Sequence, residues 1–519
     1  MSCLRRRHCR LMQTATPLLV AGAGPTGLLL ALELCRHGLR PRLVDAAPGP
    51  SPLSRALVVH ARTLELLDRH GLAHAFVGRG EVLRAAGLRL HGRLRAVAPV
   101  GRIGTGLSPF PFLLTLSQDQ TEQLLREALA GYGVAVEWGT RLLGLSTEAD
   151  GVTVQLQRGA GAVETARTGY VAGCDGAHSA VRHALGVGFP GGTYEQVFFV
   201  ADTVTEGLDA PGGARLLQIS LDERQFSAFF PMPQGCTRII GLLPPGVAPA
   251  EASFEQLRPA LEQLERIRVR EVSWFSTYKV HHRVAEAFRR GRVLLLGDAA
   301  HVHSPAGGQG MNTGLGDAVN LGWKLAAVAE GQAPERLLDT YAAERLPFAR
   351  QLVATTDRAF TGATSGSAWA SWVRTQLVPR VLPWLLRVPA LRRLLFRILS
   401  QTGIHYPDSP LSQGRAGRAR GGDRLPWAPE PRYEPLRQPG WQLLSLGKPT
   451  AALRTWAARQ PLPLTVVPPG QGEAAGTIYL VRPDGYLGLV APRFDEPQFS
   501  AYAAEWNVRG MVPDAGFQP

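Results

Sequence analysis

The sequence predicts an α/β protein that begins with a parallel sheet flanked by helices, continues into an inserted antiparallel sheet and ends in a smaller α/β domain. Near the N-terminus, short apolar runs alternate with a helical pattern, as in parallel sheets. Between about residues 185 and 285 the pattern changes to closely spaced strands, which favour an antiparallel sheet. A Gly/Arg-rich stretch at 414–426 then precedes a third group of strands.

The first two strands enclose a glycine loop. An apolar strand over Leu18–Val20 is followed by the letters GAGPTG, a helix, and a second strand that ends at Asp45. This order of strand, G-x-G-x-x-G, helix, strand and acidic residue is the fingerprint of a Rossmann-type dinucleotide-binding unit, in which the acid holds a ribose. The residues expected to bind the dinucleotide here are Gly22, Gly24, Pro25, Thr26, Gly27 and Asp45.

A second site element lies at 291–325. A strand over Val293–Leu296 stops just before Asp298, and a loop with five glycines between 307 and 316 leads into a helix. A carboxylate at a strand's carboxyl edge can accept hydrogen bonds from ribose or ribityl hydroxyls, and the N–H groups that begin a helix suit an anion. A ligand with a polyol chain and a ring that becomes anionic on reduction is a flavin. The residues expected at the flavin are Asp298, Gly308, Gly310, Met311 and Asn312.

A third element, Tyr170–Gly173, is a strand that ends at Asp175-Gly176 before another helix. Taken alone, Asp175 could be an ordinary helix cap. Together, however, the three elements resemble the group A flavin monooxygenases, the FAD-dependent aromatic hydroxylases of the p-hydroxybenzoate hydroxylase type. That resemblance implies that the motif of Asp175 serves both FAD and the nicotinamide donor, and that Asp298 meets the flavin ribose.

The resemblance implies further cofactor contacts. In the segment SRALVVHARTLELL it places Arg55 beside the cofactor, where the guanidinium would face phosphate or reduced flavin. It also implies that Gln118 reaches FAD, that Leu142 passes near the adenine through its backbone, and that Pro305 walls the pocket beside the ring. Arg55 and Pro305 are therefore the two candidate catalytic residues.

The activity that the resemblance implies is hydroxylation of an aromatic substrate with FAD, O₂ and NADPH or NADH, through a flavin C4a-hydroperoxide. The backbone N–H groups of Gly310, Met311 and Asn312 would stabilise the negative flavin ring. A small phenol or a polycyclic, antibiotic-like polyketide would be the substrate. A flavin-dependent epoxidase, a Baeyer–Villiger-type oxygenase and a non-catalytic FAD-binding scaffold stay open as alternatives; a halogenase is disfavoured because its W-x-W-x-I-P motif is not evident.

The middle and end of the chain predict the remaining domains. Phe226, Phe229 and Phe230 lie in an expected strand and would either line an aromatic substrate pocket or belong to the core. The turn Arg482–Gly485 resembles the R-P-D-G hairpin of a thioredoxin-like domain that some aromatic hydroxylases carry. In this sequence the C-terminal domain contains no cysteine. The expected division is a FAD-binding domain in two parts, 16–184 and 286–406, a substrate-binding sheet domain at 185–285, and a thioredoxin-like domain at 407–519.

Composition limits the choice of partners. The net charge is +14 but only three lysines occur, and no arginine run alternates with aromatic residues, so no nucleic acid is expected. Five cysteines without metal-ligand spacing indicate reduced thiols in a cytoplasmic protein and no metal site. We expect a monomer or a homodimer. No apolar segment reaches spanning length. The arginine-rich segment 369–400 could be an interfacial membrane helix, but Pro379, Pro383 and Pro389 favour packing on the flavin domain.

Overall fold

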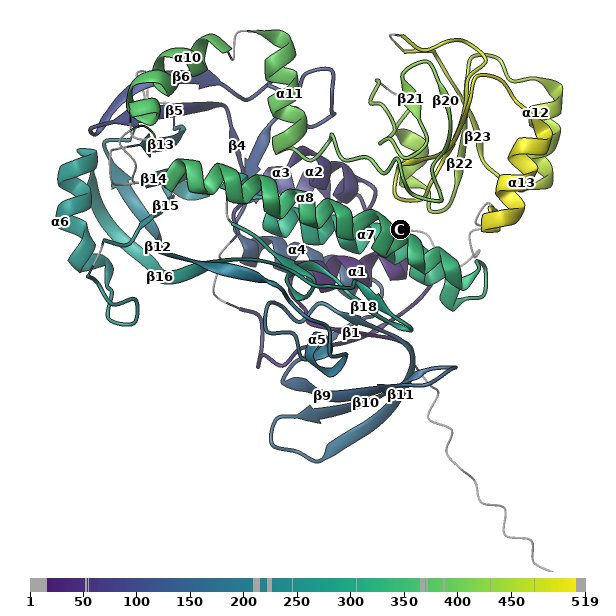
Figure 1. The fold of residues 1–519 in the computed structure, drawn as a ribbon, viewed down its shortest axis with the longest axis horizontal. Helices are drawn as coiled ribbons and strands as arrows, with labels where there is room; N and C mark the ends of the chain where they lie inside the picture. The colour runs from purple at the N-terminus through teal and green to yellow at the C-terminus, as the bar shows by residue number, and fades with distance from the viewer. Residues whose placement is uncertain are drawn as a thin grey trace, which may run out of the picture.

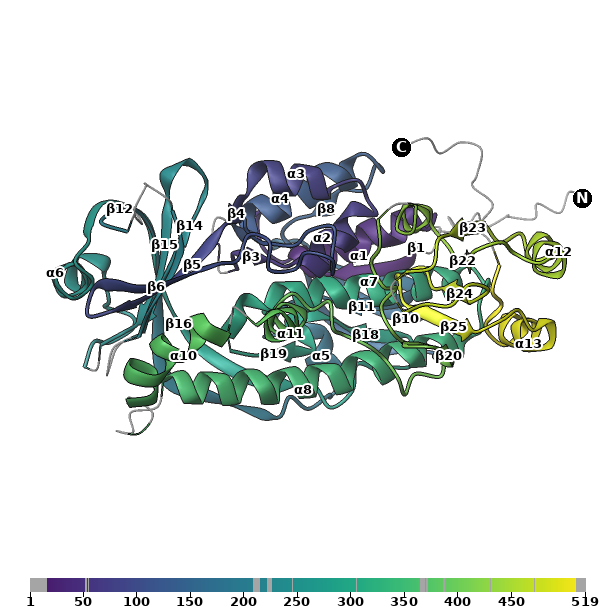
Figure 2. The same cartoon turned by 90° about the horizontal axis from the view of Figure 1, so that it is seen from above.

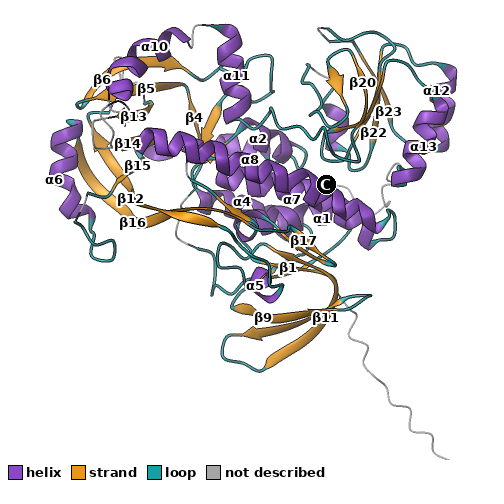
Figure 3. Ribbon diagram, viewed as in Figure 1, coloured by secondary structure: helices purple, strands orange, loops and turns teal. Residues whose placement is uncertain are grey.

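The described part of the computed structural model contains four sheets and the helices that pack on them (Figure 1). The structure describes residues 16–509 except 52–53, 55, 209–214, 222–225, 245, 305, 365–368, 370–371, 386–387, 430 and 471. The predictions for Arg55 and Pro305 therefore lie outside the described residues. Figure 3 shows the mixed α/β composition that the sequence predicts.

The central sheet has the order β17-β18-β11-β1-β2-β8. Strands β1, β2, β11 and β18 are mutually parallel neighbours, which confirms the parallel sheet, while β9 and β10 extend β11 as an antiparallel branch. Helices α1 and α7 pack against each other so closely that a Cβ added at Gly322 of α7 would lie 2.6 Å from the Cβ of Glu33 on α1. The bounds are β1 (Thr16–Ala21), β2 (Arg42–Val44), β8 (Val136–Glu137), β9 (Thr140–Thr147), β10 (Val152–Arg158), β11 (Val163–Gly173), β17 (Arg289–Arg290), β18 (Val293–Leu295), α1 (Pro25–Arg36), α4 (Gln118–Ala130), α5 (Ala180–Ala184) and α7 (Gly310–Ala329).

The second sheet is mainly antiparallel, with the order β19-β16-β12-β15-β14-β13-β5-β6. Its outer strands β5 and β6 come from residues 85–99, for which the sequence pattern indicated no strand. Helix α6 covers one face, where Phe199, Phe229 and Ile239 pack with Phe254 and Leu257. The bounds are β5 (Ala85–Leu90), β6 (Arg93–Pro99), β12 (Gly191–Glu206), β13 (Leu217–Leu221), β14 (Phe226–Pro231), β15 (Thr237–Leu242), α6 (Phe254–Glu265), β16 (Arg268–Val284) and β19 (His301–Val302).

A long helix, α8 (Asp339–Thr364), runs between the two sheets and past the C-terminal part (Figures 1 and 2). Shorter elements fill the space around it and around the small sheet β3-β7-β4. They are β3 (Val58–Val59), α2 (Ala61–Asp68), α3 (Ala73–Arg79), β4 (Glu81–Leu83), β7 (Leu113–Thr115), α10 (Val378–Leu385) and α11 (Pro389–Leu399). None of the helices in the described part of the chain is long and apolar enough to cross a bilayer.

The C-terminal part contains a six-stranded sheet with the order β21-β20-β25-β24-β22-β23. Strands β22 and β23 are parallel and joined through α12, and β24 runs antiparallel to both β22 and β25. The third group of strands that the sequence predicts after 414–426 is thus confirmed. The bounds are β20 (Gln413–Ala416), β21 (Ala419–Arg420), β22 (Gln442–Leu446), α12 (Ala451–Arg459), β23 (Leu464–Val467), β24 (Ile478–Val481), β25 (Leu487–Ala491) and α13 (Glu496–Trp506).

The turn between β24 and β25 joins this part to the rest through buried charges. The Arg482 guanidinium donates to both carboxylate oxygens of Glu344 on α8, at 2.6 and 2.9 Å, and also pairs with Asp484. Lys324 of α7 donates to Glu344 at 2.8 Å, and Trp323 donates its indole N–H to Asp484. All four charged side chains are buried. Burial lowers the pKa of Lys324 to about 8, although Glu344 opposes that shift.

Because a buried charge that loses its partner is costly, Arg482→Met should lower the free energy of unfolding by about 3–5 kcal/mol. The matched control is Arg459→Gln, which removes an exposed pair with Glu496 in the same part of the chain and should cost less than about 1 kcal/mol. Chemical denaturation followed by fluorescence compares the two. Equal losses in both variants would contradict a structural role for the buried cluster.

Candidate functional site

The glycine loop after β1 is shaped by close backbone contacts. Gly22 has φ +103°, and a Cβ there would lie 2.3 Å from the Cys174 carbonyl oxygen; at Gly27 it would lie 1.9 Å from the Gly22 oxygen. At Gly24, which precedes α1, a Cβ would meet nothing within 4 Å. The first turn of α1 has no acidic residue, and among the described residues no side chain caps it. The loop therefore leaves open space in front of unpaired N–H donors, which suits a pyrophosphate.

Asp45 lies at the carboxyl end of β2 and is held by this loop. Its carboxylate accepts hydrogen bonds from the backbone N–H groups of Ala23 at 2.6 Å and Ala47 at 2.8 Å. The side chain remains partly exposed. A groove of about 350 Å³ begins at the next residue, and it gives a ribose on Asp45 an adjoining space for a base. The groove is lined by Ala46, Pro48, Gly139, Arg141, Leu143, Gln157 and Gly159.

Thr26 joins the two glycine-rich segments of the site. A Cβ at Gly297 would lie 2.7 Å from the Thr26 Oγ1, and one at Gly314 of α7 would lie 2.3 Å from the same atom. The side chain of Thr26 thus packs where α1, α7 and the turn after β18 meet. In that turn Asp298 is exposed, at the strand's carboxyl edge as predicted.

The start of α7 presents backbone donors that the helix itself cannot satisfy. The helix begins at Gly310. Its first backbone hydrogen bond runs from the Thr313 N–H to the Gln309 carbonyl. The N–H groups of Gly310, Met311 and Asn312 therefore have no partner within the helix. Among the described residues no side chain caps this end. The arrangement fits an electron-rich carbonyl of a flavin ring.

The Asn312 side chain fixes this helix end in place. Its amide oxygen accepts from the His60 N–H at 2.9 Å and from the Thr63 hydroxyl at 2.7 Å. Its amide nitrogen donates to the Val58 carbonyl at 2.8 Å and the Gly308 carbonyl at 2.9 Å. Every hydrogen-bonding position of the amide is used. The sequence indicated Asn312 for its backbone; the structure shows that its side chain positions the loop.

A buried carboxylate, Asp317, supports α7 one turn further on. It accepts hydrogen bonds from the Gly297 N–H at 3.1 Å, the Arg345 guanidinium at 2.6 Å and the His301 ring at 2.7 Å. Burial raises the pKa of Asp317, but Arg345 and His301 outweigh it and leave the pKa below its usual value. The residue therefore stays ionised and ties the turn that carries Asp298 to α7 and α8.

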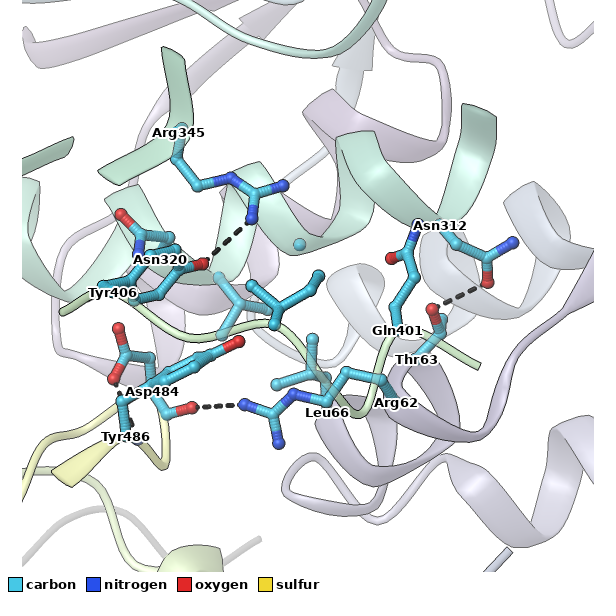
Figure 4. Close-up of a pocket in the computed structure, with 13 residues that line it drawn as sticks. Arg62, Thr63, Leu66, Asn312, Asn320, Arg345, Gln401, Tyr406, Asp484 and Tyr486 are labelled. Carbon is cyan, nitrogen blue, oxygen red and sulfur yellow. Dashed lines mark hydrogen bonds between the residues drawn. The ribbon is translucent and has the colours of Figure 1, made fainter. Parts of the chain in front are cut away.

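Between α2, α7 and the C-terminal part lies a small cavity of about 20 Å³, lined by both polar and apolar side chains and large enough for roughly one water molecule. Figure 4 shows Arg345 and Tyr406 on one side of it and Asn312 and Thr63 on another. Gln401 donates to the Thr313 hydroxyl, and Arg345 donates to Tyr406 at 2.9 Å. The N-terminal end of α7 is thus held by residues of the 401–406 segment.

The side chains of Asp175 and Gln118 form hydrogen bonds with nearby groups of the protein. The Asp175 carboxylate accepts from the Ser179 hydroxyl and from the Val181 N–H at 3.0 Å, so it caps α5, and burial raises its pKa. Gln118 begins α4, where its amide donates to Glu122 and accepts from the Ala56 N–H at 3.3 Å. The helix-cap alternative for Asp175 is therefore present in the structure, and its contact with a cofactor stays a prediction.

Leu142 is buried in the core, whereas its neighbour Leu143 lines the groove beside Asp45. Any approach of Leu142 to the adenine is therefore through its backbone, as the resemblance implies. On β9, the Thr140 N–H donates to the Asp45 carbonyl at 2.8 Å, which places the start of this strand next to Asp45.

Arg238 of β15 is a functional candidate that the sequence did not reveal. Its side chain is fully buried, donates twice to Asp202 at 2.7 Å, and reaches the Ser54 hydroxyl at 3.2 Å. Ser54 in turn accepts from the Gln118 N–H at 2.9 Å. The antiparallel sheet thereby holds the residues on either side of position 55. A lone arginine in a strand carries no sequence signal for such a contact.

The same face of the antiparallel sheet carries aromatic side chains. Phe230 pairs directly with Arg238 across the strands, so both project from the face that contacts Ser54. Phe226 shares this face by the two-residue period and lies near Phe198, with ring centroids 6.4 Å apart. Phe229 points the other way and is fully buried under α6. Only Phe226 and Phe230 of the three predicted residues face the flavin domain.

Comparison with known proteins agrees with this geometry. A family described as "FAD binding domain" matches residues 15–356. The chain is 38% identical to the 6-methylpretetramide 4-monooxygenase of Streptomyces rimosus, over 92% of this chain and 91% of the relative. It is 34% identical to the pentachlorophenol 4-monooxygenase of Sphingobium chlorophenolicum, over 65% and 63%.

Among solved structures, the anhydrotetracycline hydroxylase of Streptomyces rimosus superposes with a TM-score of 0.72 at 32% identity, covering 94% of this chain and 98% of that one. A flavin-dependent monooxygenase in complex with FAD and substrate gives 0.74 at 25% identity, over 93% and 96%. The family match, the near full-length relatives and the two glycine-rich ligand sites lead to one conclusion. The chain belongs to the group A FAD-dependent aromatic hydroxylases, the family that its sequence motifs resemble.

Proposed function

We propose that this monooxygenase hydroxylates a polycyclic aromatic polyketide, using FAD, O₂ and NADPH. The observation that carries the cofactor part is the pairing of two open helix N-termini with two carboxylates at strand ends, Asp45 and Asp298. The substrate class rests on relatives whose names include 6-methylpretetramide and anhydrotetracycline and which match almost the whole chain. NADPH is proposed rather than NADH because of the resemblance to the family. No second dinucleotide fingerprint occurs in the sequence.

The residues present fit FAD along its length. Asp45 would accept the adenosine ribose hydroxyls, the N–H groups around Gly24 would meet the pyrophosphate, and Asp298 would accept the ribityl hydroxyls. The N–H groups of Gly310 and Met311 would face the pyrimidine carbonyl of the ring, where negative charge develops on reduction. Bound FAD supplies the redox chemistry, and the protein supplies position and charge stabilisation.

Substrate would bind on the sheet face that Arg238 shares with Phe226 and Phe230. Aromatic side chains on this face exclude water and offer flat surfaces for a ring system. Arg55 and Pro305 would complete the pocket at the flavin, since the neighbours of position 55 are held by Arg238 and Gln118. These roles are inferred from position in the chain and from the resemblance.

We also propose the division into domains at 16–184, 185–285, 286–406 and 407–519, with the last part thioredoxin-like. The order β25-β24-β22-β23, with β24 antiparallel and α12 joining the parallel pair, supports that assignment. The described cysteines, Cys35, Cys174 and Cys236, carry free thiols, which supports a cytoplasmic location. A monomer or a homodimer would both accommodate the site.

Removing the Asp298 carboxylate should weaken FAD binding. A hydrogen bond to a charged group contributes about 1.5–3 kcal/mol, so Asp298→Ala should raise the FAD dissociation constant at least about 10-fold and yield colourless purified protein. Asp298→Asn, which keeps an acceptor without the charge, should bind FAD with intermediate affinity. Titration of apoprotein by flavin fluorescence measures both. Normal yellow holoenzyme from the alanine variant would refute the assignment.

Asn312→Ala should release the start of α7, because four hydrogen bonds are lost and the buried His60 N–H loses the oxygen that accepts from it. We expect a lower melting temperature and at least about 10-fold weaker FAD binding, from roughly 1–3 kcal/mol per unsatisfied group. Thr355→Ala is the control, since its hydroxyl bonds only its own helix. Unchanged FAD affinity in Asn312→Ala would show that the side chain does not position the loop.

The proposed activity predicts that NADPH oxidation and oxygen uptake by yellow enzyme rise on addition of a polycyclic phenolic substrate, with one hydroxyl gained by mass spectrometry. An epoxidase or a Baeyer–Villiger-type oxygenase would instead convert an alkene or ketone panel. A non-catalytic scaffold would bind FAD without oxidising NADPH. Stimulation only by single-ring phenols would move the substrate class away from polyketides while preserving the hydroxylase assignment.

A further inference from the structure

The segment from 358 to 407 has an extreme charge composition. It contains seven arginines, at 358, 374, 380, 387, 392, 393 and 397, and no aspartate, glutamate or lysine between Asp357 and Asp408. Half of the net charge of +14 therefore lies in about a tenth of the chain. Nothing in the FAD or substrate site described above uses these arginines.

The same segment exposes apolar side chains. Of the twelve large hydrophobic residues that are exposed in the described part of the structure, seven lie between 369 and 398. Trp369 is 72% exposed, Trp384 63%, Ile398 58% and Leu394 54%. Trp369 and Trp372 stack with their ring centroids 5.3 Å apart. Packing on the flavin domain, which the prolines favoured, therefore leaves one side of the segment uncovered. The seven residues are Trp369, Trp372, Leu377, Trp384, Val388, Leu394 and Ile398.

Helix α11 shows how the two properties are combined. Phe396 anchors its inner face, where the ring closes on Gly104 so tightly that a Cβ there would lie 2.2 Å away. Leu394 and Ile398, four residues apart, share the outer face, with exposed Arg393 and Arg397 beside them. The apolar stripe is thus flanked by guanidinium groups on the side that faces away from the protein. In Figure 1, α10 and α11 lie along one edge of the molecule, with α10 next to the edge strand β6.

We propose that this surface, the exposed residues of 369–398, docks on an anionic lipid bilayer. Tryptophan favours the headgroup region, and arginine on an adjoining face attracts anionic headgroups. The described helices of this segment, α10 and α11, are short, so they can lie at the interface but cannot span the bilayer. A second copy of the chain is a poor occupant, because a symmetric contact would bring the same arginines face to face. The absence of acidic residues in the segment matches a negatively charged partner.

Co-sedimentation of FAD-loaded enzyme with phosphatidylcholine vesicles, with and without about 30% phosphatidylglycerol, tests the proposal. We expect binding to the anionic vesicles only, weakened by added salt. Binding should fall at least about 10-fold in W369S/W372S/W384S and in R380Q/R393Q/R397Q. The matched control R167Q/R270Q/R459Q removes the same charge from exposed positions elsewhere and should bind as the unmodified enzyme does.

FAD content and NADPH oxidation without substrate should be unchanged in all three variants, since none of these residues lies in the FAD or substrate site. Three results would overturn the proposal: no sedimentation with anionic vesicles, equal sedimentation with neutral vesicles, or equal loss of binding in the control. Dissociation of a dimer in the tryptophan variant, measured by light scattering, would also overturn it, because the surface would then be covered by a second copy.

Discussion

The buried carboxylate of Asp317 is the interaction on which the site geometry depends. It joins three segments that are distant in the sequence: the turn at Gly297, the strand residue His301 and Arg345 of α8. An ionised carboxylate in this position would be unstable without such partners, since burial penalises the charge by several kcal/mol. The Gly297 N–H, the His301 ring and the Arg345 guanidinium must therefore all be in place for the carboxylate to be stable. The turn that presents Asp298 and the helix that presents the N–H donors of 310–312 are fixed by the same charge.

A second buried charge cluster extends this constraint into the C-terminal part. Glu344 is one residue from Arg345 and receives Lys324 from α7 and Arg482 from the hairpin between β24 and β25. With Asp484, the cluster contains two positive and two negative side chains, so its formal charge is balanced. Such clusters define relative positions better than they add stability. The C-terminal part thus contacts α7 and α8 through this cluster.

The sequence predicted the two glycine loops because these loops have strict local requirements. Gly22 and Gly297 must be glycine, since a Cβ would collide with Cys174 or Thr26. Such required glycines recur at fixed spacings, which can be recognised in the sequence. Contacts that join distant segments leave no such spacing. Arg238 on Ser54 and the side chain of Asn312 on His60 could not be predicted, because each needs a three-dimensional neighbour. Phe229 shows the same limit: strand pattern identified the strand, but only packing under α6 shows which face is covered.

The positive charge of the chain is concentrated in the segment 358–407 and not at the start of α7. Outside 358–407 the net charge is only half of the total, spread over the other nine-tenths of the sequence. At the start of α7 the donors are backbone N–H groups, which in the proposed site would stabilise a developing negative charge without introducing a cation that must be desolvated. The excess of arginine is instead concentrated beside the exposed tryptophans, where solvent keeps the guanidinium groups hydrated. A site that must hold a flavin in both its neutral and anionic forms is better served by fixed dipoles than by this excess of positive charge.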